Sequence, residues 1–458
     1  MIAGVQPRAL PSSLEGRKTF RFVSHELSSD GEIELRYGFD DALEFVERIT
    51  IPVEAPITDE QRAQVSGLVA LLHLTAGVSY FKLAAPPEVA TEAWTPTPAA
   101  AALLEALYSE GLGEFAYENR DRLPGGLPRP VFAAAPAPAR EAIATGDRGV
   151  LVPVGGGKDS VVAIEIMRAS GRPWGLFSVK NAAPIERTAE IAGGARHIAG
   201  RVIDPQVGPL NREGALNGHV PVTAIVSLIA LITAVLNGYS AVAMANERSA
   251  SQGNVRWDGI DVNHQFSKSL RAERLLQASL AEVAPGLGYF SILRGASELA
   301  IARAFSRFPQ YHHAFTSCNA VFRLDPELRL QSWCRDCPKC RFVYLALAPF
   351  NDPEHLTSVF GADLLDDPAQ TSGFALLTAT GGHKPFECVG EEEESIAALR
   401  LIAEDPRWEE HAVVQQLATD VLGTVPPGTG DPATVFALST EHEIPAELRP
   451  AADELLGA

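Results

Sequence analysis

A glycine run followed by charged and hydroxyl side chains lies in the stretch LVPVGGGKDSVVAIEIM, residues 151–167. Its groups are three glycines, a cation, a carboxylate and a hydroxyl: Gly155, Gly156, Gly157, Lys158, Asp159 and Ser160. Glycines let a backbone close around phosphate oxygens, and the N–H groups that open a helix favour an anion. A Walker A loop would carry Ser or Thr at position 159, whereas a carboxylate there suits Mg²⁺ on a pyrophosphate. The pattern predicts a nucleotide site of another type, with a ligand-free turn as the alternative.

Four of the five cysteines lie in one segment, and they are Cys318, Cys334, Cys337 and Cys340. The close trio has the spacing Cys-x2-Cys-x2-Cys, and the distal thiolate completes the set of four that tetrahedral Zn²⁺ requires. We expect a structural zinc site here. Reduced thiols around a turn, or a redox or sulfur-transfer site, are the alternatives. So few cysteines do not form a disulfide framework, which favours a reducing compartment and hence the cytoplasm.

Polar residues in two further motifs are candidates for binding a ligand. Asn217 and His219, in NGHVPV, precede a long apolar helix, where they suit an anion or carboxylate. A helix cap and a surface loop residue are the alternative. Asn246, Glu247 and Arg248 follow the apolar run AVAMA. In an open α/β sheet the residues after a central strand face the ligand, so we expect these three to contribute to a site.

Two more segments carry reactive side chains. The motif DVNHQFSKS contains His264, Gln265 and Lys268, which suit either a substrate or a solvated helix start. The motif GGHKPFECVGEEEES contains His383 and Cys388 ahead of an acidic helix start. The acidic run needs no function, because carboxylates favour a helix N-terminus. Cys388 is either a buried structural thiol or part of an acid–base pair or active-site loop.

The elements that must position these residues follow from the apolar pattern. Short apolar runs typical of strands buried on both faces alternate with helical patterns, at residues 149–154, 174–179, 196–203, 240–245 and 289–293. This alternation predicts an α/β fold with a doubly wound parallel sheet in residues 148–349. Ligands bind such sheets at the carboxyl ends of the strands, where the glycine loop and the segment after AVAMA are expected.

Two other regions flank this sheet. Residues 1–140 are expected to form an α+β domain, with a β-meander over 18–53 and two helical segments before a Pro- and Gly-rich linker. Residues 350–458 are expected to be mostly helical and to contribute an active-site loop. No internal repeat is found.

Charge and hydropathy narrow the class of partner. The net charge of −19 argues against a broad nucleic-acid surface. The N-terminus lacks the basic flank and apolar core of a signal peptide. The apolar run over 220–236 is interrupted by polar residues and is shorter than a typical membrane span of about 20 residues, so we expect a buried helix and no membrane partner. The oligomeric state is left open.

The motif GGGKDS resembles the PP-loop of the N-type ATP pyrophosphatases, usually Ser-Gly-Gly-x-Asp-Ser, with Gly155 in place of the first Ser. The resemblance covers residues 148–345 and implies cleavage of ATP between its α- and β-phosphates, with an adenylated substrate and pyrophosphate as products. It also implies an adenine pocket near Lys180 and Asn181. The cysteine segment resembles the zinc-binding end of 7-cyano-7-deazaguanine synthases, where the gap before the trio is shorter.

A closer resemblance is to the ATP-dependent UDP-N-acetylmuramoyl-L-alanyl-L-glutamate epimerases. It rests on VPVGGGKDS, NGHVPVTAI, ANERSAS, VNHQFSKS, SWCRDCPKCRFVYLALAPF and GHKPFECVGE, with GVSYFKLAAP in the N-terminal region. The resemblance implies inversion of the terminal L-Glu of UDP-MurNAc-L-Ala-L-Glu to D-Glu in peptidoglycan precursor synthesis, using ATP and Mg²⁺ and releasing AMP and pyrophosphate.

Inversion at Cα needs one or two acid–base groups, and Cys388, His219 and His383 are the candidates. Lys158, Mg²⁺ or backbone N–H groups are candidates for stabilising the developing oxyanion. A PP-loop ligase that passes the adenylate to ammonia or a thiol is an alternative enzyme. A nucleotide-binding sensor without turnover is the alternative that is not an enzyme.

Overall fold

The computed structural model describes residues 9–123, 125–143, 146–257, 259–323, 326–378, 386–387 and 389–457. Its strands are β1 Thr19–Leu27, β2 Glu32–Phe39, β3 Leu43–Thr50, β4 Glu88–Thr91, β5 Val150–Pro153, β6 Trp174–Val179, β7 Arg196–Val202, β8 Ala241–Met244, β9 Val255–Trp257, β10 Ile260–Val262 and β11 Gly288–Ser291.

The longer helices frame the sheet and build the C-terminal region. They are α1 Asp59–Ala76, α3 Pro98–Ser109, α5 Lys158–Ala169, α6 Ala183–Ala192, α8 Val222–Leu236, α9 Leu270–Val283, α10 Glu298–Ser306, α11 Pro338–Leu347, α12 Pro353–Phe360, α14 Glu392–Ala403 and α17 Arg449–Gly457. Shorter helices are α2 Val78–Phe81, α4 Gly113–Glu118, α7 Val207–Glu213, α13 Thr371–Ala375, α15 Ala412–Leu417 and α16 Pro432–Phe436.

A single nine-stranded sheet runs through the described part of the chain, in the order β11-β8-β5-β6-β7-β3-β2-β1-β4. The segment from β11 to β7 is parallel, as expected. The meander β1–β3 is antiparallel and joins this segment because β3 pairs antiparallel with β7, through partners such as Ile49 and Arg201. The α/β class is confirmed, but the sheet is mixed rather than wholly parallel, and the N-terminal region extends it.

The central strands alternate between two hydrophobic cores, which explains their continuous apolar sequences. Val150 and Val152 of β5 face a core that contains α5, α10 and α11. Leu151, between them, faces a second core with α1, α3, α8 and α9. Successive side chains of a strand point to opposite faces, so a strand covered on both faces has no polar position. The sheet is therefore doubly wound, with helices on each side.

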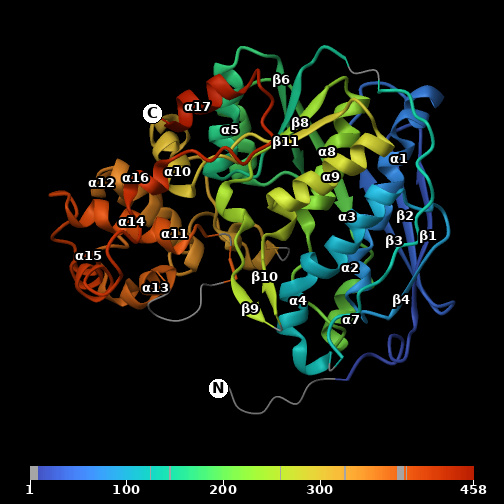
Figure 1. Cartoon of the computed structure of the whole chain (residues 1–458), viewed down its shortest axis with the longest axis horizontal. Coiled ribbons are helices and arrows are strands. Elements are labelled where there is room, and N and C mark those ends of the chain that lie inside the picture. Colours follow the sequence, from blue (N-terminus) through green and yellow to red (C-terminus); the bar gives the residue numbers. More distant parts are fainter. Residues whose placement is uncertain are drawn as a thin grey trace.

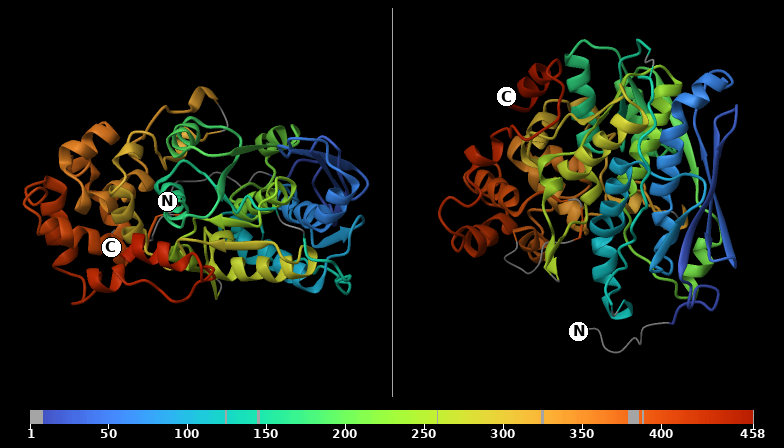
Figure 2. Two further views of the ribbon diagram at one scale, coloured as in Figure 1. Left: turned by 90° about the horizontal axis from the view of Figure 1, so that it is seen from above. Right: turned by 45° about the vertical axis from the view of Figure 1, so that its right-hand side comes forward.

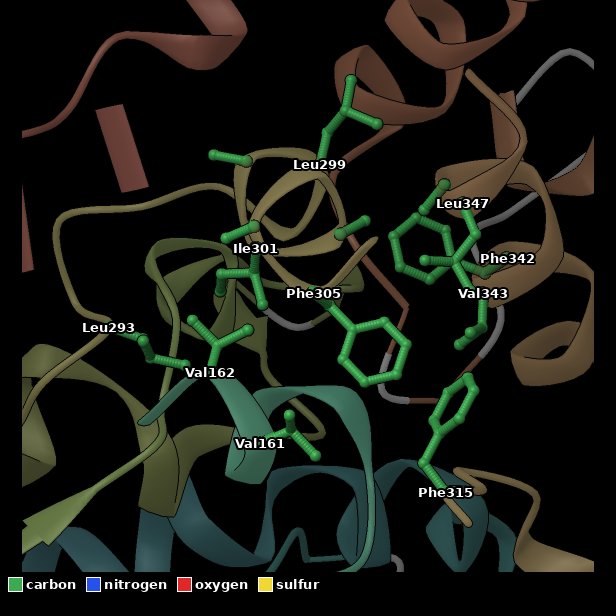
Figure 3. Packing of buried hydrophobic residues seen from close by; sticks show 14 of the residues in the cluster. Val161, Val162, Leu293, Leu299, Ile301, Phe305, Phe315, Phe342, Val343 and Leu347 are labelled. Atoms are coloured by element: carbon green, nitrogen blue, oxygen red, sulfur yellow. The ribbon is translucent and has the colours of Figure 1, made fainter. Parts of the chain in front are cut away.

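Figures 1 and 2 place the N-terminal strands at one end of the molecule and the C-terminal helices at the other, with the parallel strands between them. In Figure 3, Val161 and Val162 of α5 lie on the side of α10 that carries Ile301 and Phe305, while Leu299 points away from α5. Phe342, Val343 and Leu347 of α11 continue this core toward the C-terminal helices. The C-terminal region is mostly helical, as expected, and it covers one face of the sheet.

The secondary structure matches the sequence prediction in most of the sheet and departs from it at short elements. The hairpin β9–β10 and the four-residue edge strand β4 were not expected. The apolar run over 220–236 forms the buried helix α8, as predicted. The segment Asp59–Phe81 is the described stretch with the length and apolarity of a membrane span, and an apolar stretch of 18 residues within it is 89% buried inside the protein.

Candidate active site

A cavity of about 520 Å³ lies at the carboxyl ends of three parallel strands. Pro153, Val179 and Met244 end β5, β6 and β8 in its wall, and the N-terminal turn of α8 adds Val222 and Thr223. Two lysines, Lys268 and Lys339, also line it. This is the edge of an α/β sheet at which ligands bind, and the lysines supply positive charge in a chain whose net charge is −19.

The glycine loop forms the floor of this cavity between β5 and α5. The Ser160 hydroxyl accepts a hydrogen bond of 2.9 Å from the Gly155 N–H. Gly156 has φ of +79°, and a Cβ there would lie 2.9 Å from the Ile185 nitrogen, so this position requires glycine. Gly157 precedes the first residue of α5. The predicted strand–loop–helix arrangement is therefore present, and Gly155, Gly157, Asp159 and Ser160 line the cavity.

Lys158 lies beneath the loop rather than in the cavity wall. Its side chain is 2% exposed, and its ammonium pairs with Asp159 at 2.5 Å and with the buried Glu298. Burial lowers the pKa of Lys158, but the carboxylates of Asp159 and Glu298 outweigh that effect and raise the pKa above its usual value. Burial raises the pKa of Glu298. The lysine is thus a charged anchor that fixes Asp159, and the role predicted for it at the phosphates stays a prediction.

The polar segment after β8 is divided between the cavity and the protein interior. Asn246 lines the cavity, and its amide donates to Ser291 at 3.0 Å. Glu247 is buried, and its backbone carbonyl accepts from Arg294 at 2.6 Å. Arg248 donates to the carbonyls of Ala437 at 3.0 Å and Val435 at 3.4 Å. Only Asn246 of this predicted trio lines the cavity.

The two residues that the PP-loop resemblance assigns to an adenine pocket lie just beyond β6. Lys180 and Asn181 are both exposed. The Asn181 side-chain oxygen accepts a hydrogen bond of 2.6 Å from Arg196. Lys180 has φ of +65°. Neither is in the wall of the cavity, where the end of β6 contributes Ser178 and Val179 instead.

Three segments that are distant in sequence meet beside the cavity and contribute Glu114, His219 and His264. We refer to these three residues as the histidine cluster. The His219 and His264 rings are 4.3 Å apart between centroids. His264 Nδ1 is hydrogen-bonded to the Glu114 carboxylate. The ligand atoms of all three side chains lie within 4.8 Å of one another. Burial first, and then the proximity of His264, lowers the pKa of His219 to about 4, so its imidazole is neutral at pH 7.

Two lysines place positive charge near the histidine cluster. Lys82 donates to Asn217 Oδ1 at 2.7 Å and to the Gly218 carbonyl at 3.0 Å, which ties the N-terminal region to the loop that carries His219. Burial lowers the pKa of Lys82 to about 8. Lys268 lines the cavity and contributes to the lowered pKa of His219. The histidine cluster is therefore electrostatically coupled to the cavity wall.

Sequence reasoning did not name Glu114, Glu298, Lys339 or Lys82 as site residues. Glu114 lies on the short helix α4, and nothing in its local sequence marks it. The motif GVSYFKLAAP did mark Lys82, and Lys339 lies inside the cysteine motif. Both lysines therefore lie in motifs that can be recognised in the sequence.

The C-terminal segment reaches the site through Phe386 and Glu387. The Phe386 ring lies 5.5 Å from the Tyr117 ring of α4, between centroids. The Glu387 carboxylate accepts a hydrogen bond of 2.7 Å from Asn319, which lines the cavity. The predicted acid–base residues His383 and Cys388 lie outside the residues that the structure describes. Their described neighbours nevertheless contact both the cavity wall and the helix that carries Glu114.

The four sulfur atoms of Cys318, Cys334, Cys337 and Cys340 lie within 4.8 Å of one another. The Sγ of Cys340 is 3.4 Å from that of Cys337 and 3.6 Å from that of Cys334. Thiolates at about 2.3 Å from a tetrahedral zinc ion would be separated by similar distances. Hydrogen bonds from Cys337 and Cys340 lower the pKa of the Cys318 thiol. This cysteine cluster therefore fits zinc, and it includes the distal Cys318.

The cysteine cluster supports the cavity directly. The Thr316 N–H donates to the Gly156 carbonyl at 2.9 Å. A Cβ on Gly157 would lie 2.8 Å from the Ser317 hydroxyl. Thr316, Ser317 and Asn319 all line the cavity. The residues next to Cys318 therefore pack against the glycine loop and form part of the cavity wall.

These features define an α/β protein with a cavity at the carboxyl edge of its parallel strands and a histidine cluster beside it. Residues 12–292 match the MurL N-terminal domain, and residues 314–428 match the MurL C-terminal domain. No solved structure matches the chain.

Three similar proteins carry the name UDP-N-acetyl-α-D-muramoyl-L-alanyl-L-glutamate epimerase. The protein of Salinispora tropica is 48% identical over 89% of this chain and 89% of its own length. That of a Micromonospora species is 46% identical over 93% and 96%, and that of Xanthomonas oryzae pv. oryzae is 42% identical over 94% and 96%. The chain belongs to the MurL family.

Proposed function

We propose that this protein inverts the terminal L-glutamate of UDP-MurNAc-L-Ala-L-Glu to D-glutamate, with ATP as the second substrate. The observation that carries the proposal is the identity of 42–48% to relatives named for this epimerisation, over 89–94% of the chain. The two matched family domains, residues 12–292 and 314–428, span the segments that form the cavity, the histidine cluster and the cysteine cluster.

The cavity has groups that suit the phosphates of ATP. The glycine loop opens α5, so its N–H groups and the helix dipole favour an anion, and Lys268 and Lys339 add charge. Asp159 would hold a Mg²⁺ ion, because its carboxylate lines the cavity and is fixed by Lys158. The ion would neutralise the phosphate charge. The protein's part is to hold the carboxylate in place.

Adenylation explains why an epimerase would use ATP. A Cα–H next to a carboxylate is very weakly acidic, because its removal adds a second negative charge. Transfer of AMP to the carboxylate removes the first charge and leaves an ester-like carbonyl, into which the carbanion can delocalise. A base then removes the Cα proton, and an acid returns one to the opposite face. Hydrolysis of the adenylate releases the epimer and AMP.

We assign one acid–base group of this reaction to His219, supported by His264 and Glu114. The pKa of His219, lowered to about 4 mainly by burial, keeps the imidazole neutral and able to accept a proton. The Glu114 carboxylate orients His264 through its hydrogen bond to Nδ1. Lys268, which lines the cavity, would stabilise the negative charge of the enolate. Cys388 and His383 remain the candidates for the opposite face.

The same three side chains also satisfy the spacing of a metal site, but the neighbouring lysines oppose a cation. We propose that zinc binds at the cysteine cluster alone. Metal analysis of the purified protein should then find one zinc per chain. Two would assign a second metal to Glu114, His219 and His264.

The decisive experiment is turnover in deuterated water with ATP, Mg²⁺ and UDP-MurNAc-L-Ala-L-Glu. We expect deuterium at the glutamate Cα, together with AMP and pyrophosphate whose formation depends on the muramoyl dipeptide. A ligase would consume added ammonia and leave Cα unlabelled. A sensor would bind ATP without forming AMP. Either result would reject the proposal.

The phosphate site has its own test in Asp159→Asn. This variant should lower AMP formation by at least about 100-fold, while Glu186→Gln, on the exposed face of α6, should change it by less than about twofold. Wild-type pyrophosphate release from Asp159→Asn would remove the phosphate-site assignment.

A further inference from the structure

A second cavity, of about 510 Å³, is lined in part by α4, the helix that carries Glu114 of the histidine cluster. Its wall includes Gly113 and Ala116 of α4, Trp257 and Val262 of the β9–β10 hairpin, and Arg129. In Figure 1 the hairpin and α4 lie side by side, and the contacts between α4 and β10 agree with this view. None of the motifs predicted from the sequence accounts for this cavity.

The two sites share their supporting elements. Gly113 and Ala116 face the second cavity, and Glu114 lies between them in the same single turn of helix, within about 5 Å along its axis. His264 follows Val262 by two residues. A molecule in the second cavity would therefore be adjacent to the histidine cluster, which is in turn coupled to the ATP cavity through Lys268.

We propose that the second cavity binds the uridine diphosphate end of the muramoyl dipeptide substrate, an inference that rests on the proposed function. The substrate is long, with a nucleoside diphosphate at one end and the reacting glutamate at the other. The histidine cluster shares α4 with the second cavity and interacts with Lys268 of the first cavity. This arrangement lets the glutamate reach His219 and the ATP cavity while the nucleotide stays in the second cavity.

The side chains of the second cavity have the chemistry of nucleotide binding. The Trp257 ring, in edge contact with Tyr117 at 5.9 Å between centroids, offers an aromatic surface for a base. Arg129 is exposed and has no ion-pair partner among the described residues, and a guanidinium matches phosphate oxygens. Glu110, the carboxylate in the wall, is already paired with Arg271 at 2.9 Å. The pairing leaves Arg129 available to an anion.

The test compares two substrates in the full-length protein. One is UDP-MurNAc-L-Ala-L-Glu, and the other is N-acetyl-L-Ala-L-Glu, which lacks the nucleotide and the sugar. Trp257→Ala and Arg129→Gln should each raise KM for the full substrate by about tenfold or more, with kcat within about threefold. Their KM for the short substrate should equal that of the wild type. Arg256→Gln, an exposed neighbour outside the cavity, is the matched control and should behave as wild type.

Binding of UDP provides a readout that does not need turnover. In wild type, UDP should inhibit competitively against the muramoyl dipeptide and not against ATP, and calorimetry should detect its binding. Trp257→Ala should lose this binding, and Trp257→Phe should restore most of it. Unchanged UDP binding and KM in both variants, or equal losses with both substrates, would overturn the inference. A wild type that binds UDP in this way but does not exchange the Cα proton would reject the proposed function and leave the binding site supported.

Discussion

The cysteine cluster and the histidine cluster are both sets of ligating side chains, but they differ in the number of ligands that they offer and in how deeply those ligands are buried. The cysteine cluster offers four soft ligands of one kind, with Cys318 and Cys340 fully buried in the core. The histidine cluster offers three ligands of two kinds, partly exposed, with Lys82 and Lys268 nearby. Structural zinc sites are closed by four protein ligands, whereas reactive sites keep an open position. The first cluster therefore holds the cavity wall, and the second is placed to react.

The largest expected effect is at the cysteine cluster. Cys340→Ser should reduce zinc from one per chain to none and lower Tm by about 10 °C or more, because a structural metal contributes folding free energy directly. AMP formation should be lost as well, since the wall beside Cys318 packs on the glycine loop. The matched control is Cys388→Ser, which should keep one zinc per chain by metal analysis. Full zinc content in Cys340→Ser would end the structural assignment.

At the histidine cluster we expect a variant to lose Cα exchange without losing thermal stability. Glu114→Gln keeps the shape but cannot hold a protonated His264 in the same way, so Cα exchange should fall by about 100-fold. AMP formation, Tm and zinc content should stay near wild type. Glu118→Gln, on an exposed position of the same helix, is the control. If Tm and exchange fell together in Glu114→Gln, the histidine cluster would be structural like the cysteine cluster.

The pH dependence separates the clusters further. The pKa of His219 is about 4, below the value near 6.5 expected in the unfolded chain. The unfolded state therefore binds more protons between these values, and stability should decrease as pH falls from 6.5 toward 4. Wild type should lose more stability across this window than His219→Gln, as measured by denaturant unfolding. Cα exchange by wild type should persist below pH 6, and an acid limb centred at pH 6.5 would contradict the role of His219.

The smallest expected effect is at Lys82. Lys82→Met removes the hydrogen bonds to Asn217 and the Gly218 carbonyl, so the loop carrying His219 should be less well held. We expect KM for the muramoyl dipeptide to rise about fivefold, with zinc content unchanged. The control is Lys18→Met, at an exposed position directly before β1. This variant should have the KM of the wild type. A KM that does not change in Lys82→Met would separate this lysine from the substrate site.

Much of the fold was predictable because its signals are local. The strands β1 and β2 lie within the meander predicted for residues 18–53, and α8 follows its apolar stretch. The hairpin β9–β10 escaped prediction because each strand has three residues, too few for a periodic pattern. The antiparallel pairing of β3 with β7 also escaped prediction. Their paired residues are 150 or more positions apart, and pairing at that distance leaves no pattern in either strand.

The candidate site shows the same difference between features that depend on neighbouring residues and features that depend on distant ones. The glycine loop and three of the cysteines were found from spacing, since their geometry is made within a few residues. The ion pair of Lys158 was not predictable, because its partner Glu298 comes from α10, 140 residues away. The structure likewise turns Arg248 toward the carbonyls of residues 435 and 437. The direction of a long side chain depends on its nearest buried charge or carbonyl partner, and the local sequence does not identify that partner.

By itself, the sequence determined the helices, most of the strands, the glycine loop and the cysteine spacing, because backbone conformation and short-range ligand geometry depend on neighbouring residues. Only the tertiary structure decided that Glu114, His219 and His264 form one cluster, and that a second cavity shares α4 with this cluster. Those arrangements depend on how the sheet and its helices pack. Packing brings together residues that no local pattern connects.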